Sequence, residues 1–187
     1  MIPDTVLIID PPEGFQSQLN AVVERIPPMD WNNIFEYWSE LRRNSLPFLN
    51  RITFTDDPMP EGRTFPRGRK IEFRRSVWRD KEGDYIIDLI AHELAHVYDW
   101  CAGPAKEIEG NGAFELPETV LRMERRAIET TMRWGFKIPG TGSAKDHYKK
   151  YADLMLRMLP PDLFPHSHPS IVYLRAVAES GDVPLSE

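Results

Sequence analysis

The chain has 187 residues, of which 41% are hydrophobic and 28% charged, with a mean hydropathy of −0.44 and a net charge of −6 at pH 7. These values predict one globular domain with a hydrophobic core. They give no general reason to expect nucleic-acid binding, and no apolar run is long enough to span a membrane. The N-terminus has no basic segment before its apolar residues, and Cys101 is the only cysteine. We therefore expect a cytoplasmic protein without disulfides or a secretory signal.

Strand-like segments are confined to the first 80 residues. Three segments rich in β-branched or aromatic residues are predicted to be strands: Thr5–Ile9, Arg51–Thr55 and Ile71–Ser76. Helical periodicity predicts helices over Gln16–Glu24 and Met29–Asn44, and the prolines and glycines of 58–68 predict a loop. Together these elements predict a small twisted sheet that precedes a mostly helical second half.

The segment Asp84–Trp100 is predicted to be one long helix with an apolar stripe along one side. A different face carries His92 and His96, which are four residues apart and therefore lie one above the other. Two imidazoles at this spacing can bind one zinc ion, and Glu93 would lie beside it as a base for a water molecule that the metal activates. The alternative is a surface helix with two solvated histidines.

Two aspartates share this polar face with the histidines. Asp88 and Asp99 are candidates to orient the imidazoles through their other N–H groups. The alternative is that both carboxylates are merely solvated.

A third ligand is expected because catalytic zinc usually has three protein ligands and one open position. Pro117–Trp134 is predicted to be a helix, and Glu124 falls at the centre of its apolar stripe. A carboxylate removed from water is normally paired or metal-bound, so Glu124 is the first choice for the third ligand. The alternative reading of Glu124 is a salt bridge to a buried arginine. Asp99 is the second choice for the ligand and His147 the third.

The remaining segments offer secondary candidates. The glycine-containing segment Cys101–Leu116 is predicted to be a loop that could act as a lid. Helices are predicted over Ala144–Leu159 and Ile171–Glu179. His147 or Tyr148 could donate to an oxyanion, although ordinary packing and solvation is the favoured explanation for both.

The HExxH sequence followed by a glutamate on a second helix resembles the gluzincin group of the zincin metallopeptidases. The string Glu124-Arg125-Arg126-Ala127 is similar to the ExxA core of the third-ligand helix in HtpX-type and ImmA-type peptidases. This resemblance implies that His92, His96 and Glu124 bind zinc and that Glu93 is the general base and acid. It also implies an edge strand that binds extended substrate, for which Lys70–Arg75 is the candidate.

The sequence therefore predicts an α+β protein with a minimal zincin-like fold, a small twisted sheet packed against a metal-binding helix and a mostly helical C-terminal half. We expect a single domain over 1–187, with the strands before about residue 80. The predicted function is a peptidase that uses one Zn²⁺ ion to hydrolyse a peptide or protein substrate, with no other cofactor and no membrane partner.

Two alternatives remain open at this point. The chain could be a catalytically silent zincin-fold binding, regulatory or virion-associated module of phage or bacterial origin. It could also associate with nucleic acid through 61–81, where eight basic residues stand against three acidic ones. A solvated strand and loop is the ordinary explanation of such a basic run.

Overall fold

The computed structural model describes residues 6–44, 50–57, 60–65, 69–102, 117–159 and 166–183, with only the backbone given for 41–44. Over these residues the protein is α+β, as the sequence predicts, with seven helices and one four-stranded sheet. The segment 103–116, which makes up most of the predicted lid, lies outside the described residues. Cys101 and Ala102 belong to a helix rather than to that loop. Within the described part of the chain, no helix is long and apolar enough to cross a membrane.

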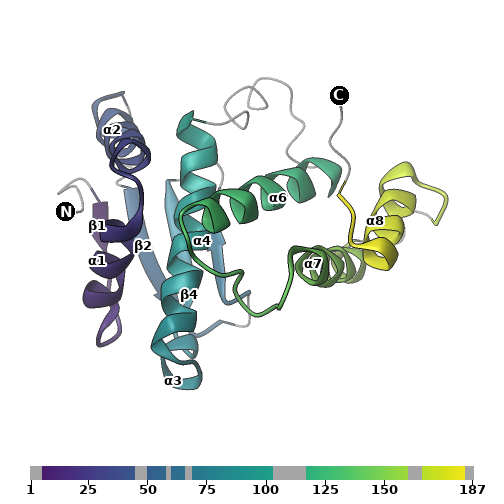
Figure 1. The fold of residues 1–187 in the computed structure, drawn as a ribbon, viewed down its shortest axis with the longest axis horizontal. Helices are drawn as coiled ribbons and strands as arrows, with labels where there is room; N and C mark the ends of the chain where they lie inside the picture. Colours follow the sequence, from purple (N-terminus) through teal and green to yellow (C-terminus); the bar gives the residue numbers. More distant parts are fainter. Residues whose placement is uncertain are drawn as a thin grey trace.

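The strands and helices are arranged as a sheet with a central helix and a helical extension (Figure 1). The strands are β1 (Val6–Ile8), β2 (Asn50–Thr55), β3 (Gly62–Thr64) and β4 (Lys70–Arg74). The helices are α1 (Phe15–Arg25), α2 (Pro28–Asn44), α3 (Val77–Asp80), α4 (Gly83–Ala102), α6 (Pro117–Arg133), α7 (Ala144–Met158) and α8 (Pro169–Ser180). Every helix and strand predicted from the sequence is present with its ends within two residues, whereas β3 and α3 were not predicted.

The order of the sheet corrects the predicted edge strand. The strands lie in the order β1-β2-β4-β3, so β4 is an inner strand and β3 forms the edge. Strands β1, β2 and β4 are parallel, whereas β3 runs antiparallel to β4 with Gly62 opposite Phe73 and Thr64 opposite Ile71. Strand β3 has only three residues, Gly-Arg-Thr, and therefore shows no alternation of polarity. Its pairing with β4, rather than its own sequence, makes it a strand.

Helix α4 packs between the sheet and its neighbouring helices. Together they form the first hydrophobic core. In Figure 1, α1 and α2 lie on one side of α4, and α6, α7 and α8 extend to the other side. Four aromatic rings, those of Phe15, Phe54, Phe73 and Trp78, pack against one another at centroid distances of 4.9–6.1 Å. These contacts fix α1 and α3 on the sheet.

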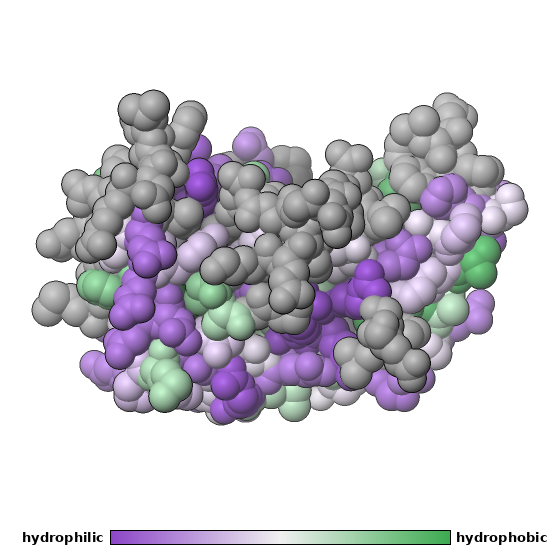
Figure 2. Space-filling view, turned by 90° about the horizontal axis from the view of Figure 1, so that it is seen from above, coloured by the Kyte–Doolittle hydropathy of each residue, from purple (hydrophilic) through white to green (hydrophobic). Residues whose placement is uncertain are grey.

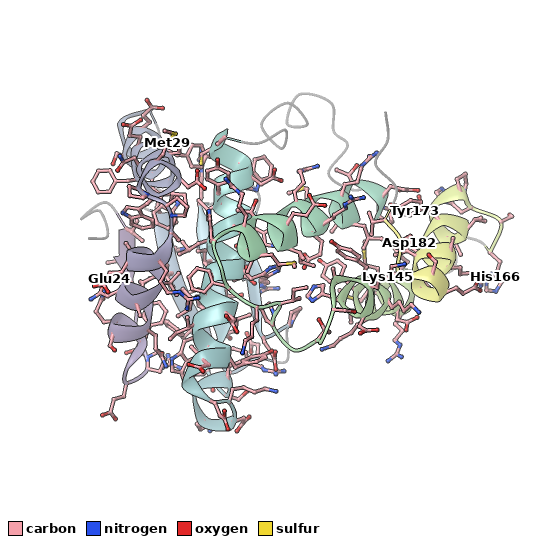
Figure 3. The ribbon with its side chains drawn as sticks, viewed as in Figure 1. Glu24, Met29, Lys145, His166, Tyr173 and Asp182 are labelled. Carbon is pink, nitrogen blue, oxygen red and sulfur yellow. The ribbon has the colours of Figure 1, made fainter. Side chains whose placement is uncertain are left out.

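A second, smaller core holds the C-terminal helices together. It contains buried residues of α6, α7 and α8, including Leu121, Tyr148 and Leu174. Helix α6 contributes to both cores, because Ala127 belongs to the first and Leu121 and Ile128 to the second. The position of α6 is therefore fixed from two sides. Lys145 of α7 also pairs with Asp182, just past α8, at 2.9 Å (Figure 3).

The edge strand is further attached by a charged cluster. The Glu72 carboxylate of β4 accepts hydrogen bonds from Arg63 Nε at 2.8 Å and Lys70 Nζ at 2.5 Å. Burial alone would raise the pKa of Glu72. The hydrogen bonds and charges of Lys70 and Arg63 outweigh burial and lower the pKa below its ordinary value of 4.5.

We expect Glu72→Gln to lower the free energy of unfolding by about 1 kcal/mol at pH 7, because it removes the charge that binds β3 to β4. Since the folded pKa is depressed, this stabilisation is complete above about pH 4.5 and is lost as the pH falls through the folded pKa. Denaturant titrations at neutral and acidic pH measure the difference, with Glu24→Gln on the exposed side of α1 as the control (Figure 3). A difference between wild type and Glu72→Gln that does not change with pH would contradict this expectation.

Candidate metal centre

Helix α4 places the two predicted histidines on a face that is covered rather than solvated. The relative exposure of His92 is 5% and that of Glu93 is 3%, because α6 and β3 pack over this side of α4. The His96 side chain is 15% exposed. The interpretation of this helix as a surface element with two solvated histidines is therefore wrong.

Glu124 of α6 meets both imidazoles of α4. Its Oε1 atom lies 3.0 Å from His92 Nε2, and its Oε2 atom lies 3.3 Å from His96 Nε2. Glu124 is 4% exposed, and its polar contacts within the described part of the chain are with imidazoles rather than with an arginine. The structure thus brings together the three residues that the sequence selects as metal ligands.

The imidazoles also govern the ionisation of Glu124. Burial alone would raise its pKa, but the charge of His92 and hydrogen bonds from His147, His92 and His96 hold it well below 4.5. The reciprocal effect acts on His96. Burial lowers the pKa of His96, whereas the hydrogen bond and charge of Glu124 outweigh burial and raise it. Glu124 is therefore an anion surrounded by groups that can bind a cation.

A third imidazole reaches the same carboxylate from α7. This helix begins at Ser143, whose hydroxyl accepts a hydrogen bond from the backbone N–H of Asp146 at 3.2 Å. One turn further on, His147 Nε2 lies 2.7 Å from Glu124 Oε1. Donor atoms of His92, Glu124 and His147 all lie within 4.8 Å of one another. His147, the third choice from the sequence, therefore joins the cluster together with Glu124.

The two aspartates of α4 have other partners than the imidazoles. Asp99 accepts a bidentate hydrogen bond from Arg126 of α6, at 2.8 and 2.9 Å. Asp88 accepts a hydrogen bond from the backbone N–H of Lys137 at 3.0 Å. The prediction that Asp88 and Asp99 orient the histidines is therefore wrong. Asp99 is also not placed as a third ligand. Asp99 instead fastens α4 to α6 next to the cluster.

Glu93 is held by the edge strand. The Thr64 hydroxyl lies 2.8 Å from Glu93 Oε2 and 3.0 Å from the Glu93 carbonyl oxygen. A Cβ atom at position 62 would lie 2.6 Å from Glu93 Oε1, so any other residue there would force the carboxylate to shift. Burial raises the pKa of Glu93, against the opposing charges of His96 and His92. A carboxylate with a raised pKa is suited to accept a proton near neutral pH.

The cluster lies in a cavity of about 510 Å³, a size typical of ligand sites. Strand β3 and the preceding residues form one wall, and α7 forms the opposite wall through His147, Lys150, Tyr151 and Leu154. Most of the other lining residues are apolar, among them Leu89, Trp100, Val120 and Met123. Tyr148 belongs to the second core instead, where burial raises its pKa to about 12, so it does not line the cavity.

Three residues of the site were not predicted from the sequence. Gly62 and Thr64 carry no sequence signal, because their strand is hidden in a predicted loop. Tyr151 does have one: it lies four residues after His147 on the same helix and therefore faces the same side. The Tyr151 ring lies nearly parallel to His147, at an interplanar angle of 13° and a centroid distance of 6.3 Å.

The basic segment 61–81 forms ion pairs mostly with acidic residues of its own. Its ion pairs include Arg63 and Lys70 with Glu72, Arg74 and Lys81 with Glu61, and Arg75 with Asp10 and Asp56. Figure 2 shows hydrophilic residues over much of the described surface seen from above, with apolar residues in separate small groups. Within the described residues, five basic side chains of the segment are thus ion-paired, as in a charged strand and loop, and nucleic-acid binding stays a prediction.

Comparison of the chain with protein-family models, with curated proteins and with solved structures finds no match in any of the three. The site must therefore be interpreted from its own chemistry. Imidazole nitrogens and a carboxylate oxygen are the donors that zinc takes in proteins. A buried carboxylate whose partners are all potential ligands fits a divalent cation, and His92, His96 and Glu124 are the residues that would hold it.

We expect Arg126→Met to lower the free energy of unfolding by about 3 kcal/mol, because Asp99 is 4% exposed and would be left as an unpaired buried charge. The double variant Asp99→Asn/Arg126→Met should recover part of this loss, and a double-mutant cycle by denaturant titration measures the coupling. Glu129→Gln, which breaks the exposed Arg125–Glu129 pair of the same helix, is the control and should cost less than about 0.5 kcal/mol. Additive effects of the two substitutions would contradict a coupled pair.

Proposed function

We propose that this protein is a zinc-dependent peptidase of the gluzincin type. The observation that carries the proposal is the meeting of Glu124 with His92 and His96 beside the buried carboxylate of Glu93, in a cavity large enough for a peptide segment. A purely structural metal site has no need of a base next to the ligands. When bound there, zinc would supply a Lewis acid and lower the pKa of water.

Each residue of the chain has a separate role in this proposal. His92, His96 and Glu124 hold the ion. Glu93 takes a proton from the attacking water and later delivers it to the leaving amine, because it is a carboxylate next to the ligands His92 and His96. The Thr64 hydroxyl keeps the Glu93 carboxylate at one position through its hydrogen bond, which avoids the loss of alignment that a free side chain would bring.

We further propose that the substrate binds as an extended strand along β3. Among the described residues this strand pairs only with β4, and residues 60–64 line the cavity beside Glu93. An extended peptide can add to such an edge through main-chain hydrogen bonds, which depend little on sequence. The apolar lining from Leu89, Trp100 and Met123 suits apolar substrate side chains.

The single cysteine suits a reducing compartment, and we place the protein in the cytoplasm of a bacterium or of a phage-infected bacterium.

Glu93→Gln separates the chemical step from metal binding. We expect this variant to retain one zinc ion per chain but to lose roughly 10²–10⁴-fold in kcat/KM, because the amide cannot accept the proton. Glu124→Ala is the matched variant and should lose zinc affinity instead. Elemental analysis of the dialysed proteins and cleavage of a fluorogenic peptide library measure the two properties. Wild-type protein that holds zinc but cleaves no peptide would favour the alternative of a silent binding module.

Gly62→Ala tests the contact between the edge strand and the base. The added Cβ would lie 2.6 Å from Glu93 Oε1, so the carboxylate must move. We expect a loss of roughly 10²-fold in kcat/KM with zinc stoichiometry unchanged, since small misplacements of a catalytic group have effects of this size. Gly83→Ala is the control, because its Cβ would meet nothing within 4 Å. Equal kcat/KM values for the two variants would rule out this role of Gly62.

A further inference from the structure

We infer that His147 is a fourth protein ligand of the same metal ion, so that the resting site is closed by three histidines and one glutamate. The inference rests on the metal of the proposed function but not on its peptidase activity. A gluzincin site needs only His92, His96 and Glu124, and the fourth donor comes from α7, which is neither of the two helices that carry those residues.

His147 approaches the Glu124 carboxylate as closely as the two histidines of the HExxH sequence do. His147 Nε2 lies 2.7 Å from Glu124 Oε1, compared with 3.0 Å for His92 Nε2, and His96 Nε2 lies 3.3 Å from Oε2. Ligands of tetrahedral zinc at ~2.1 Å lie about 3.4 Å from one another. Donors of His92, Glu124 and His147 are already within 4.8 Å of one another. His96 is not part of that group and reaches the other carboxylate oxygen, so a site with all four ligands requires His96 to move closer.

The surroundings of His147 hold its Nε2 atom toward the cluster. Its side chain is 15% exposed, the same as that of His96. Tyr151 lies nearly parallel to the ring, while Tyr148 and Ala152 anchor α7 in the second core. The His147 Nδ1 atom is buried without a hydrogen-bond partner among the described residues, as is that of His92. Each of these imidazoles therefore makes its polar contact through Nε2, the nitrogen that faces Glu124.

The donor count has a direct consequence for access to the metal. Four protein ligands complete the tetrahedral coordination that is typical of structural zinc, whereas a catalytic site keeps one position open. As a ligand, His147 would occupy that position and would have to move away before a substrate could reach the ion. Helix α7 and strand β3 both line the cavity, and His147 lies there with the residues of the cluster. On this inference His147 limits the access of a substrate to the metal.

The first test compares the wild type with His147→Gln. X-ray absorption spectroscopy at the zinc edge counts the imidazoles bound to zinc and does not require catalytic activity. We expect three imidazoles in the wild type and two in the variant. Chelator competition should show a loss of zinc affinity greater than about 100-fold, because a residue that only supports a ligand costs 10–100-fold. His166→Gln is the control: His166 is exposed and pairs with Arg175 at the far end of the molecule, so affinity should not change (Figure 3).

A second variant, His147→Cys, keeps the inference testable if His147→Gln fails to fold. In His147→Cys a thiolate replaces the imidazole, and the cobalt-substituted protein should gain a sulfur-to-cobalt charge-transfer absorption only if position 147 contacts the metal. Each of three results would overturn the inference. They are two imidazoles on zinc in the wild type, a loss of zinc affinity below about 100-fold in His147→Gln, or no charge-transfer band in His147→Cys. These results are separable from the proposed function. A wild type with three imidazoles that cleaves nothing contradicts only the peptidase, and an active wild type with two imidazoles contradicts only the role of His147.

Discussion

The Glu124 carboxylate is the constraint on which the arrangement of the C-terminal half depends. It is 4% exposed and ionised, so its removal from water must be offset by partners on every side. Those partners are His92 and His96 of α4 and His147 of α7. Because the three imidazoles come from two helices that both pack against α6, this one anion ties three helices together. A cation at the same place would balance the charge and use the same donors.

The fold supplies the precision that such a cluster needs. Helix α6 is buried in both hydrophobic cores, and the Asp99–Arg126 pair fastens it to α4 close to Glu124. Rigid elements on both sides keep a set of donors within the narrow limits that metal binding requires. The edge strand β3 positions the carboxylate of Glu93. Thr64 hydrogen-bonds to this carboxylate, and Gly62 leaves space for it. The donors and the base are therefore set by different parts of the structure.

The parts of the fold that were predictable are those with a local signal. The 3.6-residue periodicity of α4 and α6 places His92, His96 and Glu124 on buried faces, and the out-of-place glutamate in an apolar stripe identifies the second helix. Strand β3 was not predictable, because three residues between prolines become a strand only by pairing with β4. The partners of Asp88 and Asp99 depend on how distant helices and loops meet, which no local pattern contains. His147 was one of several possible ligands until the second core brought α7 over the cavity.

The central claim is that one divalent cation binds between the imidazoles and Glu124. The most direct measurement is an anomalous difference map at the zinc absorption edge, from crystals of protein purified without chelators and supplied with one equivalent of zinc. The account predicts one peak at ~2.0–2.2 Å from Nε2 of His92 and His96 and from a carboxylate oxygen of Glu124. A map without a peak at this position, or with Glu124 still bonded directly to the imidazoles, would contradict it.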